Sequence, residues 1–150
     1  MKIYLVQHGE SLKKEIDPQQ SLSKTGTADI ENLGHFIARQ KIEIAHLFHS
    51  GKHRAEQTAA ILASNLSKTI ELHHGLSPLD DVNPIANEIN QQTHDLMLVG
   101  HMPFMGKLIG KLVLLDEERS IIALIPGTIV CLEKTNEGKW LINWVRRPDS

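Results

Sequence analysis

The sequence predicts an α/β protein, a three-layer α/β/α sandwich whose sheet is mixed and mostly parallel. Short apolar runs alternate along the chain with stretches that repeat apolar residues at helical spacing, which is typical of this class. The two clearest runs, residues 3–6 and 95–99, are almost wholly apolar, as expected for parallel strands buried on both faces. From about residue 119 the helical spacing stops and hairpin signals begin, so we expect antiparallel strands to complete the sheet.

In the first half of the chain, strands and helices are expected to alternate. Ser23 is a suitable N-cap for the first helix, and Ile30, Leu33 and Ile37 follow at the spacing of one buried stripe. The polar stretch before Ser23 is expected to form a loop. The predicted elements are strands over residues 3–6, 44–49 and 69–73, a loop over 11–21, a helix that ends near 39–41 and a long helix that opens at 50–52.

In the second half, Asn83-Pro84 is a strong helix start, because a capping residue precedes a proline at the first helical position. Trp140 and Trp144, four residues apart in a predicted strand, are expected to share one face of the sheet. The predicted elements are a loop over 75–81, helices opening at 83 and 103, and strands over 95–99, 120–125, 128–133 and 140–145, the last three joined as hairpins.

Length and composition limit the kind of protein this is. A chain of 150 residues predicts one domain over residues 1–150. Its formal net charge of −2 provides no overall basic field, so neither nucleic acid nor an anionic membrane is expected as a partner. The single cysteine, Cys131, excludes an internal disulfide and fits a reducing compartment. Residues 3–6 are too few for a signal-peptide core and no run approaches a membrane span, so we expect a cytoplasmic protein.

Two predicted strands end in a histidine next to a glycine. His8-Gly9 follows the first strand, and Gly100-His101 follows the strand over 95–99. In an open parallel sheet, ligands bind in the crevice at the carboxyl ends of the strands. If the two strands are neighbours, His8 and His101 converge on one pocket.

The helix that opens at residues 50–52 carries cations in its first turn. Lys52 and Arg54 are unfavourable there, because the N-terminus of a helix bears partial positive charge and prefers anions. A bound phosphate would offset this cost, and arginine can hold phosphate with two parallel N–H bonds.

Three segments together resemble a known family. The segments 6–10 (Val-Gln-His-Gly-Glu), 50–59 (Ser-x-x-x-Arg-Ala-x-Gln-Thr-Ala) and 99–103 (Val-Gly-His-Met-Pro) resemble the signatures of the histidine phosphatase superfamily, in the right order along nearly the whole chain. The short length and the Leu76-x-Pro78 loop are most similar to the SixA-type phosphohistidine phosphatases. The resemblance implies a phosphoglycerate-mutase-like fold.

The resemblance also implies roles for the residues of these segments. His8 would be the nucleophile that becomes transiently phosphorylated, and Arg54 and His101 would hold the phosphoryl oxygens. The chemistry is sound, since a neutral imidazole offers a lone pair for in-line attack on phosphorus and surrounding donors stabilise the equatorial oxygens. Neither a metal ion nor another cofactor is expected.

Gln7 departs from the Arg-His-Gly pattern of the first signature. Its amide still donates to phosphate, but without charge and without the two-pronged fit of a guanidinium. Loss of one charge-assisted hydrogen bond, roughly 1.5–3 kcal/mol, would slow the reaction about ten- to a hundredfold. Lys52 is the first candidate for the missing charge, and Lys13 and Lys14 are weaker ones.

The sequence leaves the proton donor open among Glu10, Asp80 and Asp81. An imidazole leaving group, with a pKa near ~6.5, is much easier to expel than a serine alkoxide, so a weak donor favours phosphohistidine as the substrate. The short chain has little length for a capping insertion, and an open pocket suits a phosphorylated side chain on a partner protein.

Three functions compete at this stage. The first is a metal-independent phosphatase that acts on protein phosphohistidine through a phospho-His8 intermediate. The second is a catalytically weak module that binds phosphohistidine or a phosphoprotein, which Gln7 motivates. The third is a small-molecule phosphomonoesterase or mutase. The physiological substrate and the oligomeric state stay open, and the remaining histidines show no zinc-type spacing.

Overall fold

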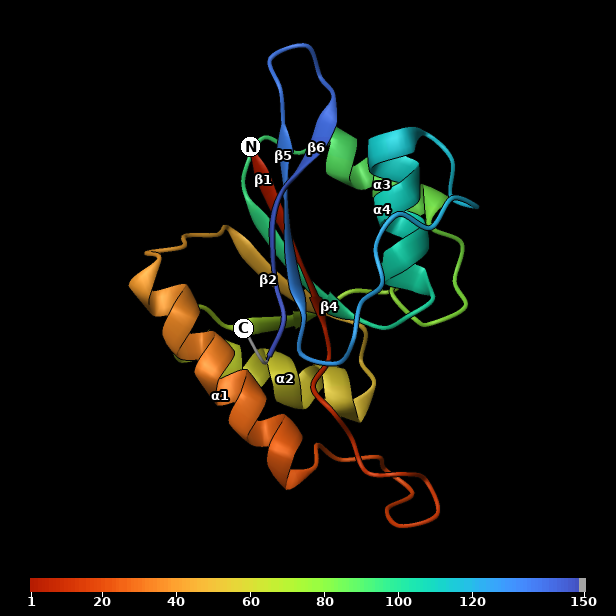
Figure 1. Cartoon of the computed structure of the whole chain (residues 1–150). Coiled ribbons are helices and arrows are strands. Elements are labelled where there is room, and N and C mark those ends of the chain that lie inside the picture. Colours follow the sequence, from red (N-terminus) through yellow and green to blue (C-terminus); the bar gives the residue numbers. More distant parts are fainter. Residues whose placement is uncertain (149–150) are drawn as a thin grey trace.

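The computed structural model describes residues 1–148, which form a six-stranded sheet with helices on both faces (Figure 1). The strand order is β3-β2-β4-β1-β5-β6. In chain order the elements are β1 (Lys2–Gln7), α1 (Lys24–Arg39), β2 (His46–His49), α2 (His53–Ala63), β3 (Ile70–Leu72), α3 (Asn83–Gln91), β4 (Leu96–Gly100), α4 (Phe104–Leu114), β5 (Ile129–Lys134) and β6 (Trp140–Arg146). The predicted three-layer α/β/α sandwich is therefore confirmed.

The sheet separates two apolar cores. On one face, α3 and α4 pack against side chains such as Ile3, Leu5 and Leu98, which we call the α3/α4 core. On the other face, α1 and α2 pack against Val6 and its neighbours, which we call the α1/α2 core (Figure 1). Successive residues of β1 enter opposite cores because side chains alternate along a strand. Within residues 1–148 no helix combines the length and hydropathy that a membrane crossing needs.

The centre of the sheet is parallel and one edge is antiparallel. β1 pairs in parallel with β4, and β4 pairs in parallel with β2, whereas β5 runs antiparallel to β1 and β6 antiparallel to β5. β1 and β4 are therefore direct neighbours, as the convergence of the two strand-end histidines requires. Their carboxyl ends lie at the same edge of the sheet.

The segment over residues 120–125 is not a strand, and that prediction is wrong. Its side chains alternate as expected, since Leu124 is buried and Ile122 packs on the α3/α4 core while Ile121 and Ile125 are exposed. The segment nevertheless pairs with no strand in the sheet, because β5 already occupies the free edge of β1. The alternation reflects packing over a sheet face instead of a ladder of hydrogen bonds.

The two tryptophans lie on opposite faces of β6, contrary to the expectation from their spacing. The register shifts between Cys131 and Leu132, so that Cys131 pairs with Trp144 and Leu132 pairs with Ile142. The extra residue at this irregularity reverses the alternation. Trp140 therefore belongs to the α3/α4 core, and Trp144 packs against the α1/α2 core.

The loop after β1 lies directly against the start of α1. Ser23 caps this helix as predicted, because its hydroxyl accepts a hydrogen bond of 3.0 Å from the Gly26 amide. Gly26 has no side chain at the point where the Glu10 backbone passes, and a Cβ there would collide with the Glu10 carbonyl oxygen. A Cβ on Gly9 would lie only 2.8 Å from Cγ1 of Ile30. Glycine at both positions allows α1 to support the loop that follows His8.

We expect Gly26→Ala to destabilise the protein although alanine normally favours a helix by about 1 kcal/mol over glycine. The new methyl group meets backbone, which cannot move without displacing the loop after His8, so the free energy of unfolding should fall by about 2 kcal/mol.

Gly34→Ala is the matched control in the same helix, because its Cβ would meet only the side chain of Asn65, which can rotate away. Urea unfolding of both variants measures the difference. Equal stability of the two variants would contradict the proposed contact.

Candidate active site

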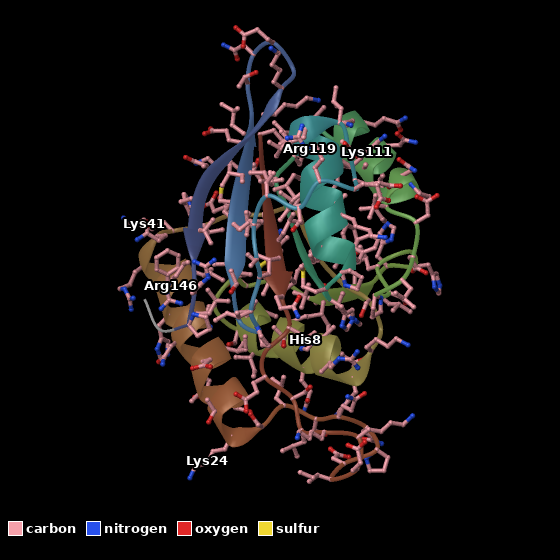
Figure 2. All side chains as sticks on the ribbon, turned by 45° about the vertical axis from the view of Figure 1, so that its right-hand side comes forward. His8, Lys24, Lys41, Lys111, Arg119 and Arg146 are labelled. Carbon is pink, nitrogen blue, oxygen red and sulfur yellow. The ribbon has the colours of Figure 1, made fainter. Side chains whose placement is uncertain are left out.

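The pairing of β1 with β4 brings His8 and His101 together. Gln7 pairs with Gly100, and the His8 amide donates to the Gly100 carbonyl over 3.0 Å. His8 and His101 come directly after this pair of residues. The centroids of their imidazole rings lie 4.9 Å apart, and the ring planes are inclined by 53°. Figure 2 shows His8 at the carboxyl end of β1, beside α2. The convergence predicted from the two strand ends is therefore observed.

The ring of His8 is held in one orientation and one tautomer. Its Nδ1 lies 2.7 Å from the Gly9 carbonyl oxygen, which can only accept, so Nδ1 carries the hydrogen. The pKa of His8 lies below the usual value for histidine, chiefly because the ring is buried and further because of the nearby Arg54 charge; the Gly9 carbonyl opposes both effects. At neutral pH the ring is uncharged, and Nε2 keeps a lone pair that can attack an electrophile.

His101 is the more deeply buried of the two histidines. Only 1% of its surface is exposed, and its Nε2 shares a hydrogen bond of 2.6 Å with the Ser50 hydroxyl. Burial lowers its pKa to about 3, and the charges of His8, Arg54 and Lys52 add to that effect. His101 is therefore neutral at any physiological pH and acts as a hydrogen-bonding group without charge.

Arg54 faces both rings from the first turn of α2. Its guanidinium is half-buried, and its charge acts on His8 and on His101. Burial lowers the pKa of Arg54, which still leaves the side chain protonated. Within residues 1–148 no carboxylate lies within ion-pair distance of it. A half-buried cation without an acidic partner, beside two neutral imidazoles, is a place for an anion.

Thr58 links Arg54 to the loop that carries His8. Its hydroxyl accepts a hydrogen bond of 3.0 Å from the Gly9 amide and donates one of 2.8 Å to the Arg54 carbonyl. The side chain is fully buried, so both bonds are protected from water. One hydroxyl group thus connects the residue after His8 with the first turn of α2.

Gln7 lies at the same edge, on the α3/α4 side of the sheet. Its side chain is 6% exposed and its Oε1 has no hydrogen-bond partner. Thr128 lies beside it, since the Gln7 amide donates to the Thr128 carbonyl over 2.9 Å. Gln7 thus ends β1 directly before His8, and it adds no charge to that of Arg54.

Each of the three candidate proton donors is exposed and makes a local hydrogen bond. Glu10 accepts from the Ser23 hydroxyl over 3.1 Å, Asp80 from the Ser77 amide over 2.9 Å, and Asp81 from the Asn83 amide over 2.9 Å. In the described part of the chain, none of these carboxylates hydrogen-bonds to His8 or His101. The geometry therefore singles out no carboxyl group as the acid.

A hollow of about 560 Å³ opens beside Arg54. Of the three lysines considered as substitutes for the missing charge, Lys14 and Lys52 line this hollow and Lys13 does not. Asp80 lines it as well, opposite the start of α2. The hollow lies between the loop after β1, the first turn of α2 and the loop 77–80, so a partner approaching it meets more positive than negative side chains.

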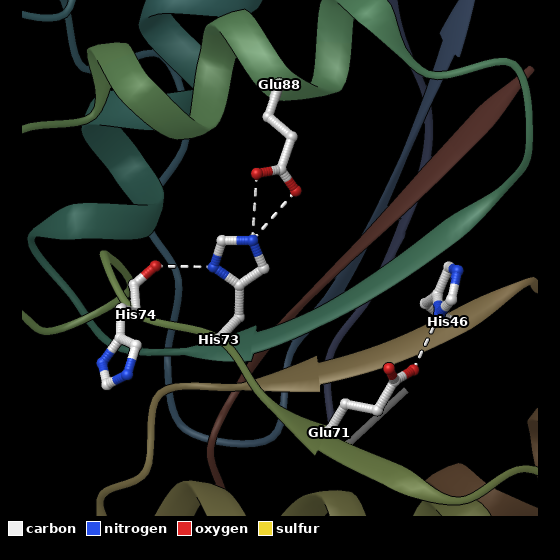
Figure 3. Close-up of polar contacts among 5 residues, drawn as sticks. All are labelled: His46, Glu71, His73, His74 and Glu88. Atoms are coloured by element: carbon white, nitrogen blue, oxygen red, sulfur yellow. Dashed lines mark hydrogen bonds and ion pairs between the residues drawn. The ribbon is translucent and has the colours of Figure 1, made fainter.

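The other histidines are distributed over strands, helices and loops, and two of them pair with glutamates near β3 (Figure 3). His73 Nε2 lies 2.9 Å from a carboxylate oxygen of Glu88, and His46 Nδ1 lies 2.7 Å from one of Glu71. Each contact is a single imidazole with a single carboxylate. Within residues 1–148, no three histidine, cysteine or acidic side chains are grouped so as to hold a metal ion.

Sequence reasoning missed the polar side chains that support the histidines. The sequence identified Ser50 and Thr58 only as motif residues with no assigned role, and Thr128 only as the start of a strand. The rule that found His8 also applies to Ser50, because a polar residue next to a glycine directly follows the parallel strand β2. No local pattern marks Thr128, whose position depends on the antiparallel pairing of β5.

Residues 3–80 match the family model of the histidine phosphatase superfamily (branch 1), which is more than half of the chain. The chain therefore belongs to this superfamily.

Among individual proteins, the chain is 25% identical to the phosphohistidine phosphatase SixA of Escherichia coli strain K12 over 155 aligned residues, which cover 99% of this chain and 94% of that protein. The structure of a SixA protein histidine phosphatase complexed with tungstate superposes with a TM-score of 0.86, at 21% identity, covering 99% of this chain and 98% of the other. A phosphoserine phosphatase mutant of Entamoeba histolytica has the same fold, with a TM-score of 0.77 at 14% identity, covering 98% and 97% of the two chains. The predicted SixA-like resemblance is confirmed.

The burial of His101 predicts a specific loss of stability in acid. Its pKa is about 3 in the folded protein and about 6.5 when unfolded, so between these values the unfolded state binds more protons and stability falls as the pH falls. His101→Asn removes this titration. From about pH 7 to about pH 5, the wild type should lose roughly 2 kcal/mol more of its free energy of unfolding than the variant does.

Urea unfolding at each pH measures this difference, and His35→Asn, at an exposed position of α1, is the control. The control should follow the wild type. If His101→Asn lost stability in acid as steeply as the wild type, the buried neutral state of His101 would be refuted.

Proposed function

We propose that this protein is a phosphatase that removes the phosphoryl group from phosphohistidine on a partner protein, with His8 as the nucleophile. The observation that carries the proposal is the state of His8, whose Nδ1–H is bonded to the Gly9 carbonyl so that a neutral Nε2 is available beside the unpaired charge of Arg54. This arrangement fits attack on a group that is electrophilic and anionic, which describes a phosphoryl group.

In the proposed reaction, the lone pair of His8 Nε2 forms a bond to phosphorus while the bond between phosphorus and the leaving nitrogen breaks in line with it. Arg54 and His101 hold the equatorial oxygens, where charge is spread in the transition state. Water then attacks phospho-His8 and releases inorganic phosphate. None of these steps uses a group outside the site described above.

Phosphohistidine is favoured over phosphoserine because no carboxyl group is positioned as a strong proton donor. An imidazole leaves much more easily than an alkoxide, so the absence of an aligned acid among residues 1–148 costs little with this substrate. The open hollow bordered by Lys14, Lys52 and Arg54 suits the side chain of a protein. The name of the E. coli relative, a phosphohistidine phosphatase, supports the same choice.

A second candidate is a module that binds phosphohistidine with little or no turnover. Gln7 favours it, because the pocket then has one half-buried guanidinium where the superfamily resemblance implies two. Binding needs fewer precisely placed charges than transition-state stabilisation does.

The test is to incubate the protein with a histidine-phosphorylated protein that carries radioactive phosphate, followed by rapid quenching. The wild type should acquire an acid-labile, alkali-stable label and release inorganic phosphate, whereas His8→Ala should acquire none. Arg54→Ala should slow labelling at least about a hundredfold, because it removes the one charge that faces the phosphoryl oxygens.

His94→Ala, at an exposed position at the opposite edge of the sheet, is the matched control and should label like the wild type. Labelling of His8→Ala at the wild-type rate would refute the nucleophile. Tight binding of the phosphoprotein with no released phosphate over hours would favour the binding module.

A further inference from the structure

Polar atoms without partners are concentrated at one edge of the sheet. In the described part of the chain, the buried side-chain atoms with no hydrogen-bond partner are Gln7 Oε1, Thr128 Oγ1, His101 Nδ1 and Arg146 Nη1. The first three belong to residues at the carboxyl end of β1 and its neighbours on either side. A buried polar atom without a partner costs about 1–3 kcal/mol, so a ligand that paired with these atoms would recover that cost.

The sheet register places these residues next to one another. Gln7 lies between Gly100 of β4, which precedes His101, and Thr128, whose carbonyl accepts from the Gln7 amide. All three side chains are more than nine-tenths buried, at 6%, 1% and 0% exposure for Gln7, His101 and Thr128. The three residues therefore lie side by side at the end of the sheet where His8 follows β1.

The charged and titratable groups around this edge supply little positive charge. β1 contributes His8 and β4 contributes His101, and burial lowers the pKa of both, so neither carries a charge at neutral pH. The start of α2 contributes Arg54, which is half-buried, and Lys52, which is exposed. The residue before β5 at this end of the sheet is the neutral Thr128. One half-buried charge thus faces the phosphoryl group.

Gln7 and Thr128 differ from an arginine in what they can bind. A guanidinium only donates hydrogen bonds, whereas a glutamine amide and a threonine hydroxyl each also accept one. A doubly charged phosphoryl group has no hydrogen to give to an acceptor. A singly protonated one has a P–O–H group, and its single negative charge matches the single guanidinium.

We propose that this site takes the phosphoryl group as its singly protonated monoanion, with the P–O–H group donating to the unpartnered acceptors of Gln7 and Thr128. This proposal rests on the proposed function, because it concerns the pocket of His8. Gln7 is then a specificity-determining residue that favours the singly protonated phosphoryl group over the doubly charged one.

The proton of the monoanion can also protonate the leaving group, for which no carboxylic acid is aligned. As His8 Nε2 bonds to phosphorus, the bond from phosphorus to the partner's imidazole nitrogen breaks and its electron pair stays on that nitrogen. The P–O–H group turns from the acceptors of Gln7 and Thr128 toward that nitrogen and its proton passes to it, so that a neutral imidazole leaves. The total charge of −1 is conserved, because phospho-His8 then carries a cationic ring and a doubly charged phosphoryl group.

The test compares inorganic phosphate with sulfate by calorimetry on the full chain. Phosphate changes from singly to doubly charged between about pH 6 and about pH 8, whereas sulfate stays doubly charged without a proton throughout. The affinity of the wild type for phosphate should fall about tenfold over this range, following the singly protonated fraction. Sulfate should bind more weakly than phosphate at low pH, and any protonation of His8 affects both ions alike.

Two substitutions at position 7 separate the parts of the proposal. Gln7→Met keeps the volume but removes the acceptor, so phosphate should lose its advantage over sulfate at low pH. Gln7→Arg should reverse the preference, with both doubly charged ions bound more tightly. Gln91→Met, at the exposed end of α3, is the control and should behave like the wild type.

A phosphate affinity that stays constant or rises with pH, or a sulfate affinity that falls as steeply, would overturn the proposal, and the wild type alone decides this if a variant does not fold. The phosphorylation of His8 is measured independently of these affinities, by the labelling experiment described above. A labelled His8 with no preference for the monoanion refutes only the inference drawn here, whereas monoanion preference without any label refutes only the phosphatase.

Discussion

The parallel pairing of β1 with β4 is the constraint on which the site depends. It places the residue after each strand at one edge, and the hydrogen bond from the His8 amide to the Gly100 carbonyl fixes the two chain segments where they leave the sheet. A shift of one residue in this register would turn His8 away from His101 and also exchange the side chains between the two cores. The apolar side chains of β1 and β4, buried on both faces, hold the register that the chemistry needs.

Burial leaves the histidines of the site uncharged but the arginine charged. It keeps both imidazoles neutral, which leaves His8 available as a nucleophile, and it leaves the guanidinium of Arg54 as the fixed half-buried charge. Charged interactions are stronger in such surroundings than in water, so one cation has a large influence. The hydroxyls of Ser50 and Thr58 then set positions without adding charge. The site combines a weakly charged pocket with firmly placed hydrogen-bonding groups.

Much of the active site could be predicted from the sequence because short local patterns mark its residues. Strand ends with a histidine beside a glycine, and cations in the first turn of a helix, identified His8, His101 and Arg54, and the structure brings these three together. The segment over 120–125 was misread, because an alternating pattern reports burial on one side and does not report a strand partner. Thr128 could not be identified as part of the site, since its place follows from an antiparallel pairing with β1, more than a hundred residues away in sequence.

The irregularity between Cys131 and Leu132 gives the molecule a property unrelated to its chemistry. It sends the two indole rings of the chain to different sides of the sheet, so Trp140 senses the layer of α3 and α4 and Trp144, in contact with Phe36, senses the layer of α1 and α2. Each layer therefore contains its own intrinsic fluorophore. Because the segment that carries Arg54 belongs to the layer of Trp144, the emission of that one indole distinguishes loosening of the phosphate-facing helix from loosening of the opposite layer.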